Sequence, residues 1–264
     1  MMLTDLADWF REAGLTVIEE PDWKTRGVTW TPIGMMQHHT APPNPYPIYK
    51  LYPPLSTNNR IKANFAVTAT GVVHTIAAGA CNYSSGTGSN TVIDEVKRGI
   101  APSGTAASRG LIDNTVGNML FVNNETDHPG DGSPIPVAQY EACVKAWAVL
   151  CRHMGWTANR VISHGEFTAR KIDPRWNGQD SHEAMVDMRA DVEEALKEAE
   201  PVTFDEFVKM DKAQLGRHGY LEAGKDATDD EWRVARNRAY RDLRHARTLW
   251  QRLRDMFRRD EPVE

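Results

Sequence analysis

The chain has 264 residues, of which 41% are hydrophobic and 25% charged, and its formal net charge is −5. This length can bury a full core, and it allows one large domain or one domain with an appendix, of which we favour the second. The composition is that of a soluble globular protein, and the negative charge gives no general reason to expect nucleic acid as a partner. The three cysteines lack CxxC spacing, so they indicate neither a disulfide framework nor a cysteine-only zinc site.

The N-terminal segment predicts a short amphipathic helix. Thr4 is a candidate N-cap, and apolar residues recur at helical spacing from Leu6 until Gly14 ends the pattern. Charged residues interrupt this segment, so it does not have the pattern of a signal peptide. No apolar run of about eighteen residues occurs anywhere, which excludes a predicted spanning helix. We therefore expect a chain that is made and kept in the cytosol unless another factor releases it.

Strand patterns dominate the next part of the chain. They occur at residues 15–19, 34–37, 64–70 and 72–77, and Gly71 joins the last two as a hairpin. The strand at 34–37 ends next to His38, where a rigid scaffold suits a ligand. Residues 79–90 are rich in Gly, Ser and Asn, which is equally typical of a substrate-facing loop and of an ordinary surface loop.

The second half of the chain alternates strands and helices irregularly. We expect a strand at Asn118–Asn123 that runs into Glu125, a helix at Val137–Met154, a short strand at Val161–Ile162 and a helix at Ser181–Ala199. There is neither a strict βαβ repeat nor a glycine-rich phosphate loop. The sequence therefore predicts an α/β fold with a mixed central sheet flanked by helices.

Two separated motifs carry metal-binding chemistry. The first, Q-H-H-T-A, contains His38 and His39, and the second, S-H-G-E-F-T-A-R-K-I-D-P, contains His164 and Asp173. Two neutral imidazoles and one carboxylate form a common catalytic zinc set, because they leave the centre positive enough to acidify a water molecule. Adjacent side chains on a strand point to opposite faces, so only one of His38 and His39 should face the metal.

These motifs, in this order, together with V-N-N-E and V-A-Q-Y-E-A, resemble the zinc N-acetylmuramoyl-L-alanine amidases of the amidase-2 and peptidoglycan-recognition-protein type. The segments L-A-D-W-F-R-E-A-G-L-T-V and W-K-T-R-G look especially like endolysins of phages that infect actinobacteria. The resemblance covers about residues 1–200, which it implies are the catalytic domain. It also implies bacterial peptidoglycan as the substrate, and release from the host cytoplasm by a separate membrane-permeabilising protein.

The resemblance also implies roles for individual residues. The metal ligands would be His38, His164 and Asp173, whereas a contribution from His39 stays open. Lys171 would stabilise an oxyanion, and Glu125 would act as base and then as acid. Two segments depart from the family pattern: V-N-N-E replaces the commoner I-G-I-E, and the C-N-Y-S-S-G loop lacks a histidine followed by Ala-Gly. In that loop, the candidate substrate contacts are Asn82 and Tyr83.

Residues 201–264 lie outside the resemblance and predict a helical, basic region. T-D-D-E at 228–231 is a capping box, and apolar residues then recur at helical spacing from Trp232 to Phe257. Between Trp232 and Arg259 there are ten arginines and two aspartates, which gives a local net charge of +8. This region could pack on the catalytic domain, pair with a second copy, or bind anionic wall polymers or an anionic membrane surface.

Three functions stay open at this point. The first is a hydrolase that cuts the amide between N-acetylmuramic acid and L-alanine. The second is a module that binds the same glycopeptide without cutting it, and the third is a zinc peptidase that cuts within the stem peptide. The complete ligand set and Lys171 favour the first.

Overall fold

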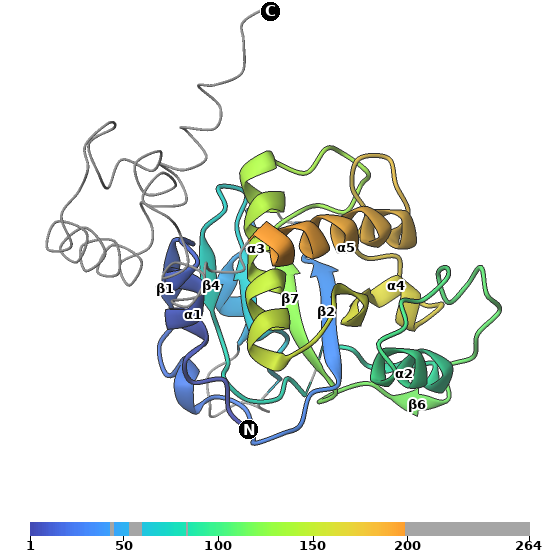
Figure 1. The fold of residues 1–264 in the computed structure, drawn as a ribbon, viewed down its shortest axis with the longest axis horizontal. Helices are drawn as coiled ribbons and strands as arrows, with labels where there is room; N and C mark the ends of the chain where they lie inside the picture. Colours follow the sequence, from blue (N-terminus) through green and yellow to red (C-terminus); the bar gives the residue numbers. More distant parts are fainter. Residues whose placement is uncertain (43–44, 53–59, 83, 199–264) are drawn as a thin grey trace, which may run out of the picture. The chain divides into compact units, whose positions relative to one another are not determined.

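The computed structural model describes residues 1–42, 45–52, 60–82 and 84–198. Their centre is a six-stranded sheet in the order β1-β4-β3-β7-β2-β8. Within this sheet only β3 and β4 pair antiparallel, while its other neighbouring strands are parallel, and β5 and β6 form a separate antiparallel pair. The predicted α/β class with a mixed sheet and flanking helices is confirmed (Figure 1).

The elements are short apart from two helices. The strands are β1 Val17–Glu19, β2 Gly34–His39, β3 Phe65–Val67, β4 Val73–Thr75, β5 Thr87–Gly88, β6 Thr115–Val116, β7 Phe121–Thr126 and β8 Val161–Ser163. The α-helices are α1 Leu6–Glu12, α2 Asn90–Lys97, α3 Val137–Met154, α4 His164–Phe167 and α5 Ser181–Glu198. Three 3-10 turns lie at Trp23–Thr25, Ile48–Leu51 and Ala158–Arg160.

Helices α3 and α5 cover one face of the sheet (Figure 1). On this face Trp147 of α3 is fully buried, packs edge-on against Phe65 of β3 and donates its indole N–H to Gln37 of β2 at 2.8 Å. Because it fills a closed core and also makes a hydrogen bond, truncating Trp147 to alanine should cost about 3–5 kcal/mol. The helix ends at Gly155, whose φ of 64° suits a residue without a Cβ.

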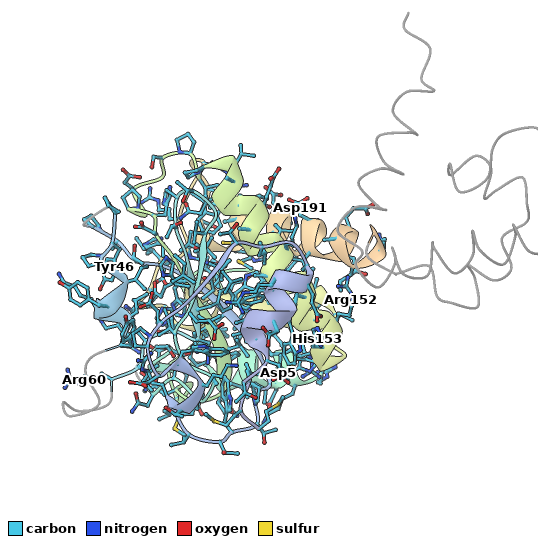
Figure 2. All side chains as sticks on the ribbon, turned by 90° about the vertical axis from the view of Figure 1, so that its left-hand side faces the viewer. Asp5, Tyr46, Arg60, Arg152, His153 and Asp191 are labelled. Atoms are coloured by element: carbon cyan, nitrogen blue, oxygen red, sulfur yellow. The ribbon has the colours of Figure 1, made fainter. Side chains whose placement is uncertain are left out.

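Side-chain contacts join helix α1 to α3 and helix α3 to α5. Trp9 of α1 stacks on His153 of α3 with ring centroids 4.0 Å apart, and Figure 2 shows His153 next to α1. Tyr140 of α3 donates to Asp191 of α5 at 2.6 Å. These contacts lie on the side of the sheet away from the sequence motifs of interest, so they support the scaffold and not the site.

The opposite face of the sheet carries α2 and the candidate site. Met36 of β2 and Phe121 of β7 point to this side and form a core with Val92 and Ile93 of α2 and with Phe167 of α4. Side chains alternate between faces along a strand, so His38 lies on the same side as Met36, and Gln37 faces Trp147. The sheet thus separates a helix-covered side from the side that bears the motifs.

A buried ion pair fixes helix α4 to α5. The Glu166 carboxylate, fully buried, accepts two hydrogen bonds at 3.0 Å from Arg189 and one at 2.7 Å from His182. Ser163 and Glu166 also form a reciprocal capping box around the first turn of α4. Removing one partner of such a buried pair typically costs about 3–5 kcal/mol, so α4 is held firmly.

Several predicted boundaries were accurate and others were wrong. The prediction for Val137–Met154 is confirmed residue for residue, and the hairpin turns at Gly71 with φ of 78°. Thr4 is not the cap: Asp5 precedes α1, without a side-chain capping bond. The strand expected at Asn118–Asn123 begins and ends three residues later, as β7, and contains Glu125 instead of preceding it.

The segment interpreted as a single Gly/Ser/Asn-rich loop contains β5 and leads into α2, which the sequence reading missed. The helix predicted from Trp232 to Phe257, with its capping box at residues 228–231, lies outside the described residues. Within the described residues, no helix is both long and apolar enough to cross a membrane.

Candidate metal centre and active site

Three residues from distant parts of the sequence converge at the carboxyl ends of the neighbouring strands β2 and β8. His38 is near the end of β2, and His164 directly follows β8, which pairs in parallel with β2 so that Gln37 lies opposite Ser163. The two Nδ1 atoms are 3.1 Å apart, and Asp173 Oδ2 lies 3.0 Å from His38 Nδ1 and 3.1 Å from His164 Nδ1. All three side chains are buried. The structure therefore brings the predicted ligand set together.

The far side of each histidine ring faces an oxygen acceptor. His38 Nε2 lies 3.0 Å from the Asn123 amide oxygen, and His164 Nε2 lies 3.2 Å from the Ser85 backbone carbonyl. A carbonyl oxygen can only accept, so both rings donate through Nε2–H. The two Nδ1 lone pairs consequently point at each other and at the Asp173 carboxylate, an arrangement that requires a proton or a cation between them.

The pKa shifts of the three residues also indicate that a positive charge is favoured between them. Burial disfavours charge on His38, but the hydrogen bond to Asp173, the negative charges of Glu125 and Asp173 and the hydrogen bond to Asn123 together outweigh it and raise the pKa of His38. Burial lowers the pKa of His164. Burial would raise the pKa of Asp173, but the charge of His164 and the hydrogen bonds from both rings hold it well below its ordinary value. Three groups thus share one proton in a space that a cation would fill.

The donor set fits zinc. One ligand atom from each of His38, His164 and Asp173 lies within 4.8 Å of the other two. Zinc bonds of about 2.0–2.2 Å in a tetrahedron place ligand atoms about 3.3 Å apart, close to the spacings of 3.0 to 3.1 Å found here. Two imidazole nitrogens with one carboxylate oxygen, and a fourth position without a protein ligand, are the pattern of catalytic zinc sites.

Glu125 lies on β7 opposite His38 of β2 and points to the same face of the sheet. Its Oε2 atom is buried and has no hydrogen-bond partner among the described residues. Burial raises the pKa of Glu125 to about 7, with the charge of His38 acting against the shift and that of Asp173 adding to it. An unsatisfied carboxylate that titrates near neutrality beside a cation site is suited to accept and return a proton.

Lys171 is exposed and lies two residues before Asp173. Its positive charge acts on Glu125, His39 and His164, which places it near the triad. The structure gives its ammonium group no hydrogen bond or ion pair with another described residue. It is therefore a cation at the rim that is free to meet an anionic group of a ligand.

His39 points away from the triad and holds a loop instead. Its Nδ1 accepts the Arg175 backbone N–H at 3.1 Å, two residues after Asp173. A Cβ on Gly130 would lie 2.1 Å from the His39 ring, so only glycine fits against it. Burial lowers the pKa of His39 to about 4, which keeps the ring neutral. His39 thus supports the segment that carries Asp173 and is not a member of the ligand set.

The two candidate substrate contacts have different outcomes. Asn82 is exposed, and its side-chain oxygen accepts the Ile61 backbone N–H at 3.0 Å. This oxygen therefore connects two segments of the chain. Tyr83 lies outside the described residues.

The sequence reading missed the buried polar residues around the site. Asn123, Ser85 and Glu166 each contact a ligand or the turn that carries one, and all three are fully buried. For Glu166 a signal existed, because Ser163 and Glu166 have capping-box spacing. Asn123 and Ser85 belong to the two segments that depart from the family pattern, but no rule of spacing marks them as buried.

The geometry describes an α/β protein with a His-His-Asp cluster that could hold a metal ion, and sequence comparison specifies the family. The family model described as N-acetylmuramoyl-L-alanine amidase matches residues 30–176, which is more than half of the 264 residues. This range includes the triad, Glu125 and Lys171. The chain therefore belongs to the N-acetylmuramoyl-L-alanine amidase family of enzymes.

The solved structures that match this chain include the following two. One, described as the structure of PlyL, is 13% identical with a TM-score of 0.39, over 68% of this chain and 95% of that one. The other, the endolysin N-acetylmuramoyl-L-alanine amidase LysCS from Clostridium intestinale, is 13% identical with a TM-score of 0.35, over 59% of this chain and 85% of that one. Comparison with curated proteins gives no match.

Proposed function

We propose that this chain is a zinc-dependent peptidoglycan hydrolase that cuts the amide bond between the lactyl group of N-acetylmuramic acid and L-alanine of the stem peptide. Membership of the amidase family supports the reaction class. The observation that carries the zinc mechanism is the convergence of one ligand atom each from His38, His164 and Asp173 beside Glu125, whose buried Oε2 has no hydrogen-bond partner among the described residues. His38, His164 and Asp173 hold the metal. When bound, zinc supplies a Lewis acid that polarises a carbonyl and lowers the pKa of a water molecule.

Glu125 moves the protons of the reaction. Its carboxylate takes a proton from the water that attacks the lactyl carbonyl, and the resulting carboxylic acid gives that proton to the nitrogen of L-alanine as the C–N bond breaks. The products are a lactyl carboxylate and a free amine, so atoms and protons balance. A pKa near 7 suits both steps, because the same group must accept a proton and then release it.

Lys171 stabilises the charge that forms on the carbonyl oxygen. Its ammonium group has no competing partner among the described residues, and it is connected by a short loop to Asp173. A cation at the developing oxyanion contributes most in the transition state, where the negative charge is largest. Its removal therefore lowers turnover more than it weakens substrate binding.

The biological setting is part of the same proposal. A phage endolysin that acts on the wall of an actinobacterial host, after a separate membrane-permeabilising protein releases it from the cytoplasm, agrees with the N-terminal motifs. Residues 1–200 form the catalytic domain. Residues 201–264, whose sequence is rich in arginine, act as an accessory region that binds anionic wall polymers or the membrane surface, pairs two chains or packs on the enzyme.

Metal stoichiometry tests the proposal. We expect one zinc per chain, loss of muropeptide cleavage after chelation, and recovery on addition of zinc. His164→Ala should lose both the metal and the activity, because two ligands remain. His153→Ala is the matched control, because His153 stacks on Trp9 on the other side of the sheet, and it should still bind one zinc. Full activity of the metal-free protein would overturn the zinc mechanism.

A further inference from the structure

The orientation of the Asn123 amide is fixed by its surroundings. Its Nδ2 donates to the Phe121 carbonyl at 2.6 Å, so Oδ1 is the atom that faces His38. The side chain is fully buried, and its backbone N–H donates to the Asn64 side chain at 2.9 Å. The amide can therefore neither rotate nor be replaced by water.

The same amide oxygen has a second donor. Ser85 Oγ donates to Asn123 Oδ1 at 3.2 Å, and the backbone carbonyl of Ser85 accepts from His164 Nε2 at 3.2 Å. Ser85 is also fully buried. A continuous chain of hydrogen bonds thus runs from His38 through Asn123 and Ser85 to His164. It links the outer nitrogens of both histidines, while Asp173 links the inner ones.

We propose that Asn123 and Ser85 are positioning residues that hold both histidines as Nε2–H tautomers and set the two Nδ1 atoms for the metal. The inference rests on the proposed zinc function. Histidine ligands are generally oriented by an acceptor on the second ring nitrogen, and loss of that acceptor typically weakens metal binding about 10- to 100-fold. Both residues lie in segments that depart from the family pattern, so this support belongs to this chain's own sequence.

The position requires an amide. Asn123 accepts two hydrogen bonds at one end and donates one at the other, which neither a carboxylate nor an apolar side chain can reproduce. Aspartate would set a second oxygen against the Phe121 carbonyl. Leucine, which has a similar shape, would leave the His38 N–H and the Ser85 hydroxyl without an acceptor in a buried site.

Zinc affinity of the full chain, measured by competition with a chromophoric chelator, tests the role of Asn123. Asn123→Leu should raise the zinc Kd about 10- to 100-fold. Asn124→Leu is the matched control, because Asn124 is equally buried on the same strand but bonds to Gln37 on the opposite face. It should lose stability in thermal unfolding and change the zinc Kd less than threefold. Equal zinc affinities of the two variants would overturn the proposal.

A second measurement reads the tautomer of each histidine directly in the wild-type chain. In the zinc-loaded full chain with 15N-labelled histidine, NMR should show both His38 and His164 protonated at Nε2, with slowly exchanging protons. Ser85→Ala should speed exchange of the His38 Nε2–H less than Asn123→Leu does, since it removes a neighbour of the acceptor and not the acceptor. An Nδ1–H tautomer for either histidine would overturn the proposal even if Asn123→Leu failed to fold.

Different results would contradict the proposed zinc function and the positioning role of Asn123 and Ser85. If wild-type protein bound no zinc, the proposed function would be wrong. If it bound one zinc tightly but the Asn123 and Asn124 variants lost affinity alike, only the positioning role would be wrong.

Discussion

Glu125→Gln is the substitution that isolates proton transfer from the rest of the site. Glutamine keeps the size of the side chain but can neither accept nor donate the catalytic proton. In the structure, burial raises the pKa of Glu125 from 4.5 to about 7, which corresponds to a cost of about 3 kcal/mol for ionising it there. Removal of a general acid-base typically lowers the rate about 10²- to 10⁴-fold. We expect kcat to fall by about 10² or more.

The assay follows release of the L-alanine amine from a soluble muropeptide by chromatography, at saturating substrate and across pH 5 to 9. Wild-type activity should fall as the pH drops through the Glu125 pKa, because the base becomes protonated, and the variant should lose that acid limb. Zinc content should stay at one per chain, since Glu125 is not a ligand.

Glu141→Gln is the matched control, since Glu141 is an exposed acid of α3, which covers the other face of the sheet. It should retain wild-type turnover. If the turnover of Glu125→Gln stayed within threefold of wild type, Glu125 would not be the general acid-base. If that variant lost zinc, Glu125 would be a metal ligand.

Three further predictions concern other parts of the chain. Lys171→Ala should lower kcat by about 10² with zinc still bound, as loss of oxyanion stabilisation does; a change in KM alone would make Lys171 a binding residue. Burial disfavours the charged form of Asp113, but hydrogen bonds from Arg170 and Thr168, with the charge of Arg170, outweigh it and lower the pKa of Asp113. The ionised carboxylate therefore stabilises the fold at pH values above the ordinary Asp pKa of 3.8, and this stabilisation is lost as the pH falls through the lower pKa of the folded state. In urea unfolding, Asp113→Asn should accordingly be less stable than wild type near neutral pH, and this deficit should disappear once the pH falls below the lowered folded pKa of Asp113; a deficit independent of pH would contradict it. A chain ending at Glu200 should cleave soluble muropeptide at close to the full rate but lose salt-sensitive binding to intact walls; if it lost soluble activity, the C-terminal region would belong to the catalytic domain.

The sequence was sufficient for the parts of the fold that rest on periodic apolar patterns. Helix α3 has an unbroken helical pattern closed by Gly155, and the hairpin has alternating residues around Gly71, so both could be located. The metal ligands could be named because they stand in two recognisable motifs. Their convergence also follows from parallel strands β2 and β8, whose carboxyl ends share one edge.

Buried polar residues account for what could not be predicted. Asn123 and Asn124 are unfavourable in strands by composition, so the pattern placed the strand too early. In the structure, Asn123 bonds to His38 through its amide oxygen and to the Phe121 carbonyl through its amide nitrogen, and the Asn124 amide nitrogen donates to Gln37. Such partners come from distant segments, and no local pattern specifies them. The role of His39 was undecidable for the same reason, since its partner is a backbone N–H at residue 175.

Digestion of purified peptidoglycan in 18O-labelled water, followed by mass spectrometry of the products, tests the central claim most directly. Hydrolysis of the amide by water places its oxygen on the acyl carbon. We predict 18O in the lactyl carboxylate of N-acetylmuramic acid, new amino termini on L-alanine only, and no reaction after zinc is removed. Label in the carboxylate of a stem-peptide amino acid would identify a zinc peptidase, and binding without any labelled product would identify a recognition protein; either result would contradict the proposed amidase.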